Sequence, residues 1–248
     1  MKIGIVGYGK MGREVERLAL EGGHEVVWKL DVDGNAAGAG LDAARLAAVD
    51  LCIEFTLPAA AAANVQRILS EGGRVVCGTT GWFDSLPRVR EAARGGAGLV
   101  WGSNFSLGAY LFGVLVADAA RRFAAFPEYD AAIHEIHHAA KADHPSGTAK
   151  NLASHLISAL PGKTGVVADL VDGPVGKDRL HVSSTRVGYV PGVHTVFFDG
   201  PFDTIELRHS ARSRSGFARG ALLAAEWLLT HPGIHRFDDV VLSLMEGS

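Results

Sequence analysis

The stretch KIGIVGYGKMG, Lys2–Gly12, decides the fold of the first half of the chain. Its apolar start predicts a short strand, and apolar residues at helical spacing after the glycines predict a helix. Between them, Gly7, Gly9 and Gly12 follow the pattern G-x-G-x-x-G. In such a turn the first glycine permits the sharp bend, the second lets backbone approach a pyrophosphate, and the third lets helix pack closely on strand. The stretch therefore predicts a dinucleotide-binding turn, with Lys10 and Met11 at the helix start.

The next apolar run predicts which nucleotide is bound. Glu25–Leu30 reads as a second strand and ends at Asp31, 19 residues after Gly12. A carboxylate about 20 residues beyond the turn accepts the ribose hydroxyls of NAD and disfavours a 2′-phosphate. Asp33 competes for this role, although the DGN that it opens is typical of a turn. NADH is favoured, while Lys10 or Lys29 beside a 2′-phosphate would allow NADPH.

Strands and helices continue to alternate up to about residue 101. Apolar runs at 51–55, 74–77 and 98–101 predict strands, and the segments after Pro58 and at 86–93 predict helices. This alternation is typical of a Rossmann-type doubly wound parallel sheet, an α/β fold that binds ligands beyond the carboxyl ends of its strands. We therefore expect the cofactor to be contacted by the residues that follow these strands: Phe55, Thr56, Gly78, Thr79, Thr80, Ser103, Asn104 and Phe105.

Composition narrows the class of protein. The chain has 248 residues, of which 48% are hydrophobic and 21% charged, with a net charge of -3. Without a basic excess we expect no nucleic-acid partner. No apolar run approaches the ~18 residues of a membrane span, so we expect a soluble cytoplasmic protein. Cys52 and Cys77 lie in apolar runs, where thiols act as small hydrophobes rather than as disulfide partners.

The second half contains a segment rich in titratable groups, HEIHHAAKADHPSGTAK, His134–Lys150. Pro145 ends regular structure and Ser146 is a favoured helix cap. Gly147 and Thr148 would then present unpaired backbone N–H groups at the positive end of a helix, which suits an anion. His137, His138 and Lys141 lie just upstream and are suited to proton transfer. The segment predicts a site that binds a carboxylate and moves a proton, although residue chemistry does not rank the two histidines.

A metal centre is the alternative interpretation of the same segment. His134, His137 and His138, with Glu135 and Asp143, are ligand types for zinc. The chain has neither an H-E-x-x-H pattern nor a cysteine pair, and a cation would repel Lys141. We therefore expect no metal.

Residues 135–149, EIHHAAKADHPSGTA, closely resemble the signature of the 4-hydroxy-tetrahydrodipicolinate reductase (dihydrodipicolinate reductase) family. In that family the pattern reads E, an aliphatic residue, HH, two variable positions, K, one variable position, D, a small residue and PSGTA. The chain departs from it at His144, where alanine is usual, and we expect this imidazole to face solvent.

The resemblance implies an activity and its residues. The implied reaction is NAD(P)H-dependent reduction of 4-hydroxy-tetrahydrodipicolinate to tetrahydrodipicolinate with loss of water, in lysine biosynthesis through diaminopimelate. It assigns His137 as proton donor or acceptor and Lys141 as proton donor. It also assigns His138, Gly147 and Thr148 to the carboxylates of a small dicarboxylate substrate, and implies that the cofactor meets these groups in one crevice.

The domain boundaries follow from pattern and resemblance together. We expect a dinucleotide-binding domain at 1–104, a smaller α+β domain for substrate binding and oligomerisation at 105–215, and a return to the first domain at 216–248. Runs at 182–187, 195–199 and 204–209 have the alternation of antiparallel strands. The resemblance implies a homotetramer built on this sheet. Arg186 and His194 are expected to support the sheet or a subunit interface rather than the substrate.

Two other functions remain open from the sequence. An aspartate dehydrogenase-like oxidoreductase would share the nucleotide half but needs no PSGT segment. A non-catalytic NAD-binding protein would keep the fold without the chemistry, and the presence of His137 and Lys141 disfavours it.

Overall fold

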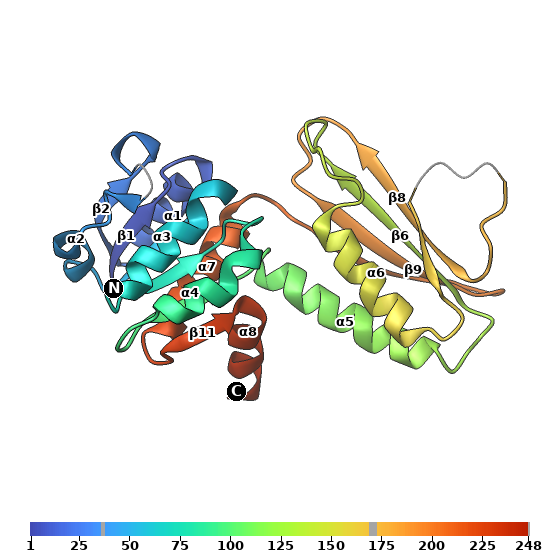
Figure 1. Ribbon diagram of the computed structural model, residues 1–248. Coiled ribbons are helices and arrows are strands. Elements are labelled where there is room, and N and C mark those ends of the chain that lie inside the picture. Colours follow the sequence, from blue (N-terminus) through green and yellow to red (C-terminus); the bar gives the residue numbers. More distant parts are fainter. Residues whose placement is uncertain (36–37, 169–172, 248) are drawn as a thin grey trace. The chain divides into compact units, whose positions relative to one another are not determined.

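The computed structural model describes residues 1–35, 38–168 and 173–247, which form two compact units. The first unit comprises Met1–Leu107 and Arg214–Ser248, and the second comprises Gly108–Ser213. Each unit has its own sheet and core (Figure 1). None of the helices in the described residues is long and apolar enough to cross a membrane.

The first unit contains a parallel sheet. Among the described residues its strands lie in the order β11-β5-β4-β3-β1-β2, and every neighbouring pair is parallel. The strands are β1 (Lys2–Val6), β2 (Glu25–Leu30), β3 (Leu51–Glu54), β4 (Arg74–Cys77), β5 (Gly98–Trp101) and β11 (Gly233–Arg236). A parallel sheet needs crossover connections, and these are the helices that alternate with the strands. The sequence prediction of a Rossmann-type doubly wound sheet is confirmed.

Helices cover both faces of this sheet. They are α1 (Lys10–Glu21), α2 (Ala43–Ala47), α3 (Pro58–Ser70), α4 (Leu86–Ala92), α7 (Ser215–Leu228) and α8 (Phe237–Glu246), with short 3-10 turns η1 (Val32–Gly34) and η3 (Phe83–Ser85). Residues of α3 and α4 share one core cluster with Val6 and Val75. The alternate strand residues, such as Ile5 and Val76, are also 0–1% exposed. Gly12 of α1 lies against Ile5, so α1 covers that second face.

The second unit combines a mixed sheet with two long helices. Its strands are β6 (Asp130–His137), β7 (Gly165–Val167), β8 (Arg179–Arg186), β9 (Val193–Asp199) and β10 (Thr204–Ser210), in the order β10-β9-β6-β8-β7. Helices α5 (Leu107–Phe123) and α6 (Gly147–Ala159) lie on the same side of this sheet (Figure 1). One core cluster joins them to Ile133, Val182 and Val196. The smaller α+β unit is therefore present.

The structure corrects one expectation about this sheet. The run that forms β8 reads as antiparallel, yet β8 is parallel to both β6 and β7. The reason is the connections, because α6 crosses over between β6 and β7, and the chain must cross over again between β7 and β8 for these two strands to be parallel. β9 pairs antiparallel with both β10 and β6, as expected. The short strands β7 and β11 were not predicted from the sequence.

Candidate active site

The glycine turn after β1 has the geometry that its spacing predicts. Gly7 has a φ of 90°, and a Cβ there would lie 2.2 Å from the carbonyl oxygen of Phe55. A Cβ on Gly12 would lie 2.2 Å from the carbonyl oxygen of Gly7, so only glycine lets α1 approach this closely. By contrast, a Cβ on Gly9 would have no neighbour within 4 Å among the described residues. Gly9 caps α1 without a side-chain hydrogen bond, which leaves N–H groups of the first turn for an anion.

A groove of about 440 Å³ lies beside this turn at the carboxyl ends of the strands. It brings together most of the residues predicted to contact a cofactor, and Pro58 adds to its wall: Gly9, Lys10, Met11, Phe55, Thr56, Gly78, Thr79 and Thr80. The hydroxyl of Thr79 accepts a hydrogen bond from the backbone N–H of Thr56 at 2.8 Å, which ties the loops after β3 and β4 together. The groove thus fits an extended nucleotide held by backbone and hydroxyl groups.

The loop after β5 differs from the other two. Ser103, Asn104 and Phe105 are not among the residues that line the groove. The ring of Phe105 is 2% exposed and lies 4.7 Å from the ring of Phe237. The side chain of Asn104 accepts a hydrogen bond from the N–H of Ser106 at 2.8 Å, which shapes the turn. Phe105 can therefore offer a cofactor only its backbone.

Charged residues near the end of β2 bear on the choice between NADH and NADPH. Asp31 is exposed, and its carboxylate accepts a hydrogen bond from the backbone N–H of Val32 at 2.9 Å. Lys29, a candidate partner for a 2′-phosphate, instead forms an ion pair with Glu16 at 2.7 Å. Lys10 is exposed and lines the groove. Of the two lysines, only Lys10 is left for the nucleotide.

Sequence reasoning missed a buried carboxylate behind the groove. Glu54, at the end of β3, is 0% exposed and accepts a hydrogen bond from the hydroxyl of Thr56. The thiol of Cys77 lies 2.9 Å from its other oxygen. Burial, together with the neighbouring Glu54 charge, raises the pKa of Cys77 well above its usual value, so this thiol stays protonated. The signal in the sequence was a single acidic residue at the end of an otherwise apolar strand.

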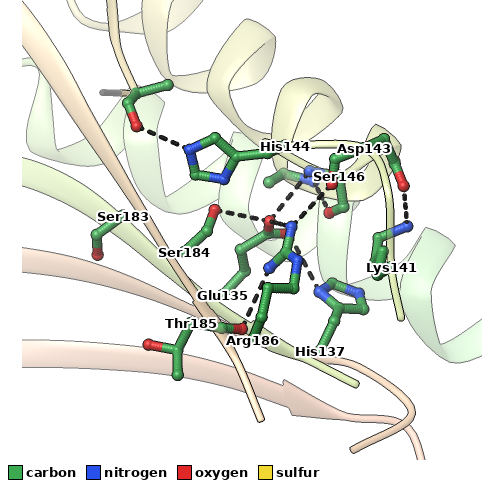
Figure 2. Close-up of polar contacts among 12 residues, drawn as sticks. Glu135, His137, Lys141, Asp143, His144, Ser146, Ser183, Ser184, Thr185 and Arg186 are labelled. Carbon is green, nitrogen blue, oxygen red and sulfur yellow. Dashed lines mark hydrogen bonds and ion pairs between the residues drawn. The ribbon is translucent and has the colours of Figure 1, made fainter. Parts of the chain in front are cut away.

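In the second unit, the start of α6 is built as predicted. Ser146 is the N-cap, and its hydroxyl accepts a hydrogen bond from the N–H of Ala149 at 3.2 Å. The N–H of Gly147 and the ammonium group of Lys141 both act on the carboxylate of Asp143, and Lys141 approaches it to 2.6 Å (Figure 2). Burial alone would raise the pKa of Asp143, but these donors outweigh it and hold that pKa below its usual value. Gly147, which was predicted to bind a substrate carboxylate, and Lys141, which was predicted to donate a proton, thus already hold a carboxylate of the protein.

His137 is enclosed at the end of β6. It is 6% exposed, and its Nδ1 atom lies 3.4 Å from Glu135 Oε2. Burial lowers the pKa of His137 to about 4, and the charges of Lys141 and Arg186 act in the same direction, whereas Glu135 opposes them. The imidazole is therefore neutral near pH 7, which suits a proton acceptor.

Glu135 is the centre of a hydrogen-bond network that the sequence prediction did not assign to the reaction. It is 0% exposed and lies on the same face of β6 as His137, two residues away. Burial would raise its pKa, but polar contacts with His194, Ser146, Ser184 and Arg186 hold it well below the usual range. Figure 2 shows the contacts of Ser146, Ser184 and Arg186 with this carboxylate. Arg186 also donates to the carbonyl oxygen of Asp143 at 2.8 Å. Arg186 and His194 therefore support the titratable segment itself.

The other histidines of the segment His134–Lys150 have surroundings different from those of His137. His134 lies on the opposite face of β6, where Nδ1 is 2.7 Å from the hydroxyl of Ser183. His138 is half-buried just beyond the strand. His144 is exposed, and its Nε2 atom lies 3.1 Å from the carbonyl oxygen of Ala168. The histidines of the zinc alternative therefore do not converge.

A different trio of potential ligands does lie close together. Glu135, His137 and His194 present atoms within 4.8 Å of one another. However, a guanidinium nitrogen of Arg186 lies 3.0 Å from Glu135 and would be repelled by a cation. The trio fits a hydrogen-bond network better than a metal.

Comparisons with known proteins cover nearly the whole chain. A family model described as the N-terminus of dihydrodipicolinate reductase matches residues 1–105, and one described as its C-terminus matches residues 108–241. A 4-hydroxy-tetrahydrodipicolinate reductase from Christiangramia forsetii is 36% identical over 247 residues, which is 99% of this chain and 100% of the relative. One from Archaeoglobus fulgidus is 38% identical over 260 residues, covering 96% and 99%.

Solved structures agree on the fold. A dipicolinate-bound dihydrodipicolinate reductase from Paenisporosarcina sp. TG-14 matches with a TM-score of 0.75 at 23% identity, covering 96% of this chain and 98% of that one. GenD2 from gentamicin A biosynthesis, solved in complex with NAD, matches with a TM-score of 0.56 at 14% identity, covering 97% and 90%. At these identities the two structures support the architecture alone.

Proposed function

This chain belongs to the dihydrodipicolinate reductase family, and we propose that it reduces 4-hydroxy-tetrahydrodipicolinate with His137 and Lys141 moving the protons. The reaction belongs to the diaminopimelate pathway to lysine and releases water. The observation that carries the proposal is local: Lys141, His137 and the start of α6 lie in one short segment that already holds a carboxylate. Neither an aspartate dehydrogenase-like enzyme nor a non-catalytic NAD-binding protein requires this arrangement.

The groove of the first unit fits a pyridine nucleotide. The open space at Gly9 and the uncapped start of α1 suit a pyrophosphate, and the groove continues to Thr56 and Thr80. When bound there, the reduced nicotinamide supplies a hydride. We infer a preference for NADH, because Asp31 is exposed at the ribose position and Lys29 is paired with Glu16. Lys10 leaves NADPH usable.

The substrate is a small dicarboxylate, for which the second unit offers cationic and N–H donors. Lys141 and the N–H groups of Gly147 and Thr148 would bind one carboxylate in place of Asp143, and His138 the other. The relative from Paenisporosarcina is described as binding dipicolinate, a ligand of this chemistry. A rigid helix start can hold such an anion with little reorganisation.

Proton transfer completes the reaction after hydride addition builds negative charge on the ring. Lys141 carries protons that it can donate, and its ammonium group also stabilises that charge. His137 is neutral near pH 7, so it can take the ring proton that is lost during dehydration and pass it to the departing hydroxyl, which leaves as water. Lys141 then supplies the proton that the ring gains after hydride addition. Hydride transfer further requires that the groove of the first unit and the Lys141 segment act on the same bound substrate.

We also infer a cytoplasmic homotetramer. In the described residues of the second unit, α5 and α6 both lie on one side of the sheet (Figure 1). The alternate residues of the strands, including Ile136 and Phe197, are half-buried on the other face. A second sheet would cover them. Analytical ultracentrifugation tests the tetramer, and a monomer at micromolar concentration would contradict it.

The function is tested with the wild-type enzyme. A synthase that forms the substrate from pyruvate and aspartate semialdehyde is coupled to it, and oxidation of NADH and of NADPH is followed separately. We expect both to be oxidised only in the presence of the synthase, with a higher kcat/KM for NADH. Oxidation that instead depends on ammonia and oxaloacetate would indicate an aspartate dehydrogenase, and binding of NADH without any turnover would indicate a non-catalytic protein.

A further inference from the structure

The carboxylate of Glu135 divides its contacts between its two oxygens. Oε1 accepts hydrogen bonds from three donors: the backbone N–H of Ser146 at 3.1 Å, the hydroxyl of Ser184 at 2.8 Å and a guanidinium nitrogen of Arg186 at 3.0 Å. Oε2 lies 3.4 Å from His137 Nδ1 and 3.5 Å from His194 Nε2. One oxygen is therefore saturated, and the other is left to the two imidazoles.

The chemistry of Glu135 and His137 decides which nitrogen of the His137 ring carries the proton. His137 Nδ1 and Glu135 Oε2 are both buried, and neither has a hydrogen-bond partner among the described residues, so their 3.4 Å approach is the contact left to each of them. An ionised carboxylate only accepts, so a neutral imidazole beside it must carry its proton on Nδ1. The lone pair of His137 is then on Nε2.

The opposite edge of the His137 ring, at Nε2, faces a glycine, which has no side chain to cover it. Gly192, in the turn before β9, has a φ of 153°, and a Cβ there would lie 3.1 Å from His137 Nε2. Any side chain at this position would cap the nitrogen. The absence of one keeps Nε2 open to a reacting group or to a water.

We propose that Glu135 is a positioning residue, which holds His137 in the Nδ1–H tautomer and so makes Nε2 the atom that takes the ring proton lost when the hydroxyl leaves as water. This rests on the proposed role of His137 in catalysis. Glu135 acts through His137 rather than on the substrate. The same carboxylate holds the N–H of Ser146 and thus the start of α6, so the proton acceptor and the carboxylate-binding turn share one anchor.

An isosteric substitution separates these two tasks. In Glu135→Gln the amide oxygen can keep the three donors of Oε1, whereas the amide NH2 faces the imidazoles. An amide donor at His137 Nδ1 selects the reverse tautomer, with the proton on Nε2. The variant should therefore keep α6 and substrate affinity but lose the acceptor.

The experiment reads the tautomer and the kinetics together. Long-range 1H–15N spectra of histidine-labelled wild type, with His137 assigned by loss of its signals in His137→Gln, should show Nδ1 protonated and Nε2 unprotonated at about pH 7.5. Glu135→Gln should reverse this pattern and lower kcat by ~10²-fold or more, with KM and the Kd of NADH changed less than about threefold. Glu135→Asp, which keeps a carboxylate, should restore the Nδ1–H tautomer and part of kcat.

A matched control and a pH profile complete the test. Ser183→Ala removes a hydroxyl from β8 beside His134, on the opposite face of the sheet, and should leave kcat unchanged. The groups that face His137 are Glu135 on β6, Arg186 on β8, His194 on β9 and Lys141. In Glu135→Gln the acid limb of the kcat profile should move to lower pH, because the charge that favours the imidazolium is gone.

Two outcomes would overturn the inference. One is an Nε2–H tautomer in the wild type, which is measurable even if Glu135→Gln fails to fold. The other is a Glu135→Gln enzyme with wild-type kcat and tautomer. If His137→Gln itself turned over normally, the catalytic assignment would fail instead, while the tautomer would still report on Glu135.

Discussion

Mild acid should destabilise this protein through the imidazole of His137. Burial lowers the pKa of His137 to about 4, from 6.5 in an unfolded chain. An imidazole with a lower pKa in the folded state binds protons more tightly when the protein is unfolded, so protons favour unfolding. The stability is fully present above about pH 6.5 and is lost as the pH falls toward 4. At about pH 5 this single group should cost roughly 2 kcal/mol of unfolding free energy.

The assay is urea denaturation of wild type and of His137→Gln at about pH 7.5 and pH 5. His209, whose pKa is also lowered by burial, contributes to both proteins and cancels in the comparison. We expect the wild type to lose roughly 2 kcal/mol more than the variant over this interval. The reasoning would be refuted if the two proteins lost the same free energy within about 0.5 kcal/mol, since His137 would then titrate alike folded and unfolded.

Four further substitutions test the two sites. Ser146→Ala removes the cap of α6, so we expect a loss of about 1 kcal/mol in urea denaturation and a raised KM for substrate; an unchanged KM would show that the helix start does not bind it. The methyl group of Gly9→Ala meets no atom of the described residues within 4 Å, so this variant should fold normally yet bind NADH at least ~10-fold more weakly by fluorescence titration. Gly12→Ala, with a contact of 2.2 Å, should also unfold more easily. Normal NADH binding by Gly9→Ala would contradict the pyrophosphate assignment. Asp31→Ser should shift the ratio of kcat/KM values toward NADPH by ~10-fold, and an unchanged ratio would place the ribose elsewhere.

The parts of the fold that were predictable have a strong local pattern. The apolar runs at Lys2–Val6, Glu25–Leu30 and Gly98–Trp101 match strands with the same bounds. The first and last of these strands are buried on both faces and read as continuous apolar runs, and glycine marks the turn after the first of them. Glu25–Leu30 is an edge strand and is only partly buried. The parallel sheet follows from their alternation with helices.

The missed elements have weak local signals. The strand Gly233–Arg236 has four residues and includes a histidine and an arginine, and it is strand only because β5 offers it an edge. Gly165–Val167 has three residues and pairs with β8 in the same way. The direction of β8 depends on the crossover connections between β6, β7 and β8, which alternation in β8 itself does not encode.

The features of the site also differ in whether they depend on local sequence or on contacts between distant residues. The cap at Ser146, the sharp turn at Gly7 and the close helix packing at Gly12 depend on neighbouring residues, so the sequence sufficed to predict them. The network around Glu135 depends on strand pairing, because Arg186 lies 51 residues away and His194 contacts Ser146 across 48. One signal was present: Glu135 and His137 alternate on a strand, and such residues point to the same face.

The measurement that bears most directly on the account is the rate of NADH oxidation by Lys141→Ala and His137→Gln, with substrate supplied by the coupled synthase and NADH affinity measured in parallel. We expect each variant to lose ~10²-fold or more in kcat while binding NADH as the wild type does. Turnover close to that of the wild type in either variant would show that this segment does not carry the proton chemistry.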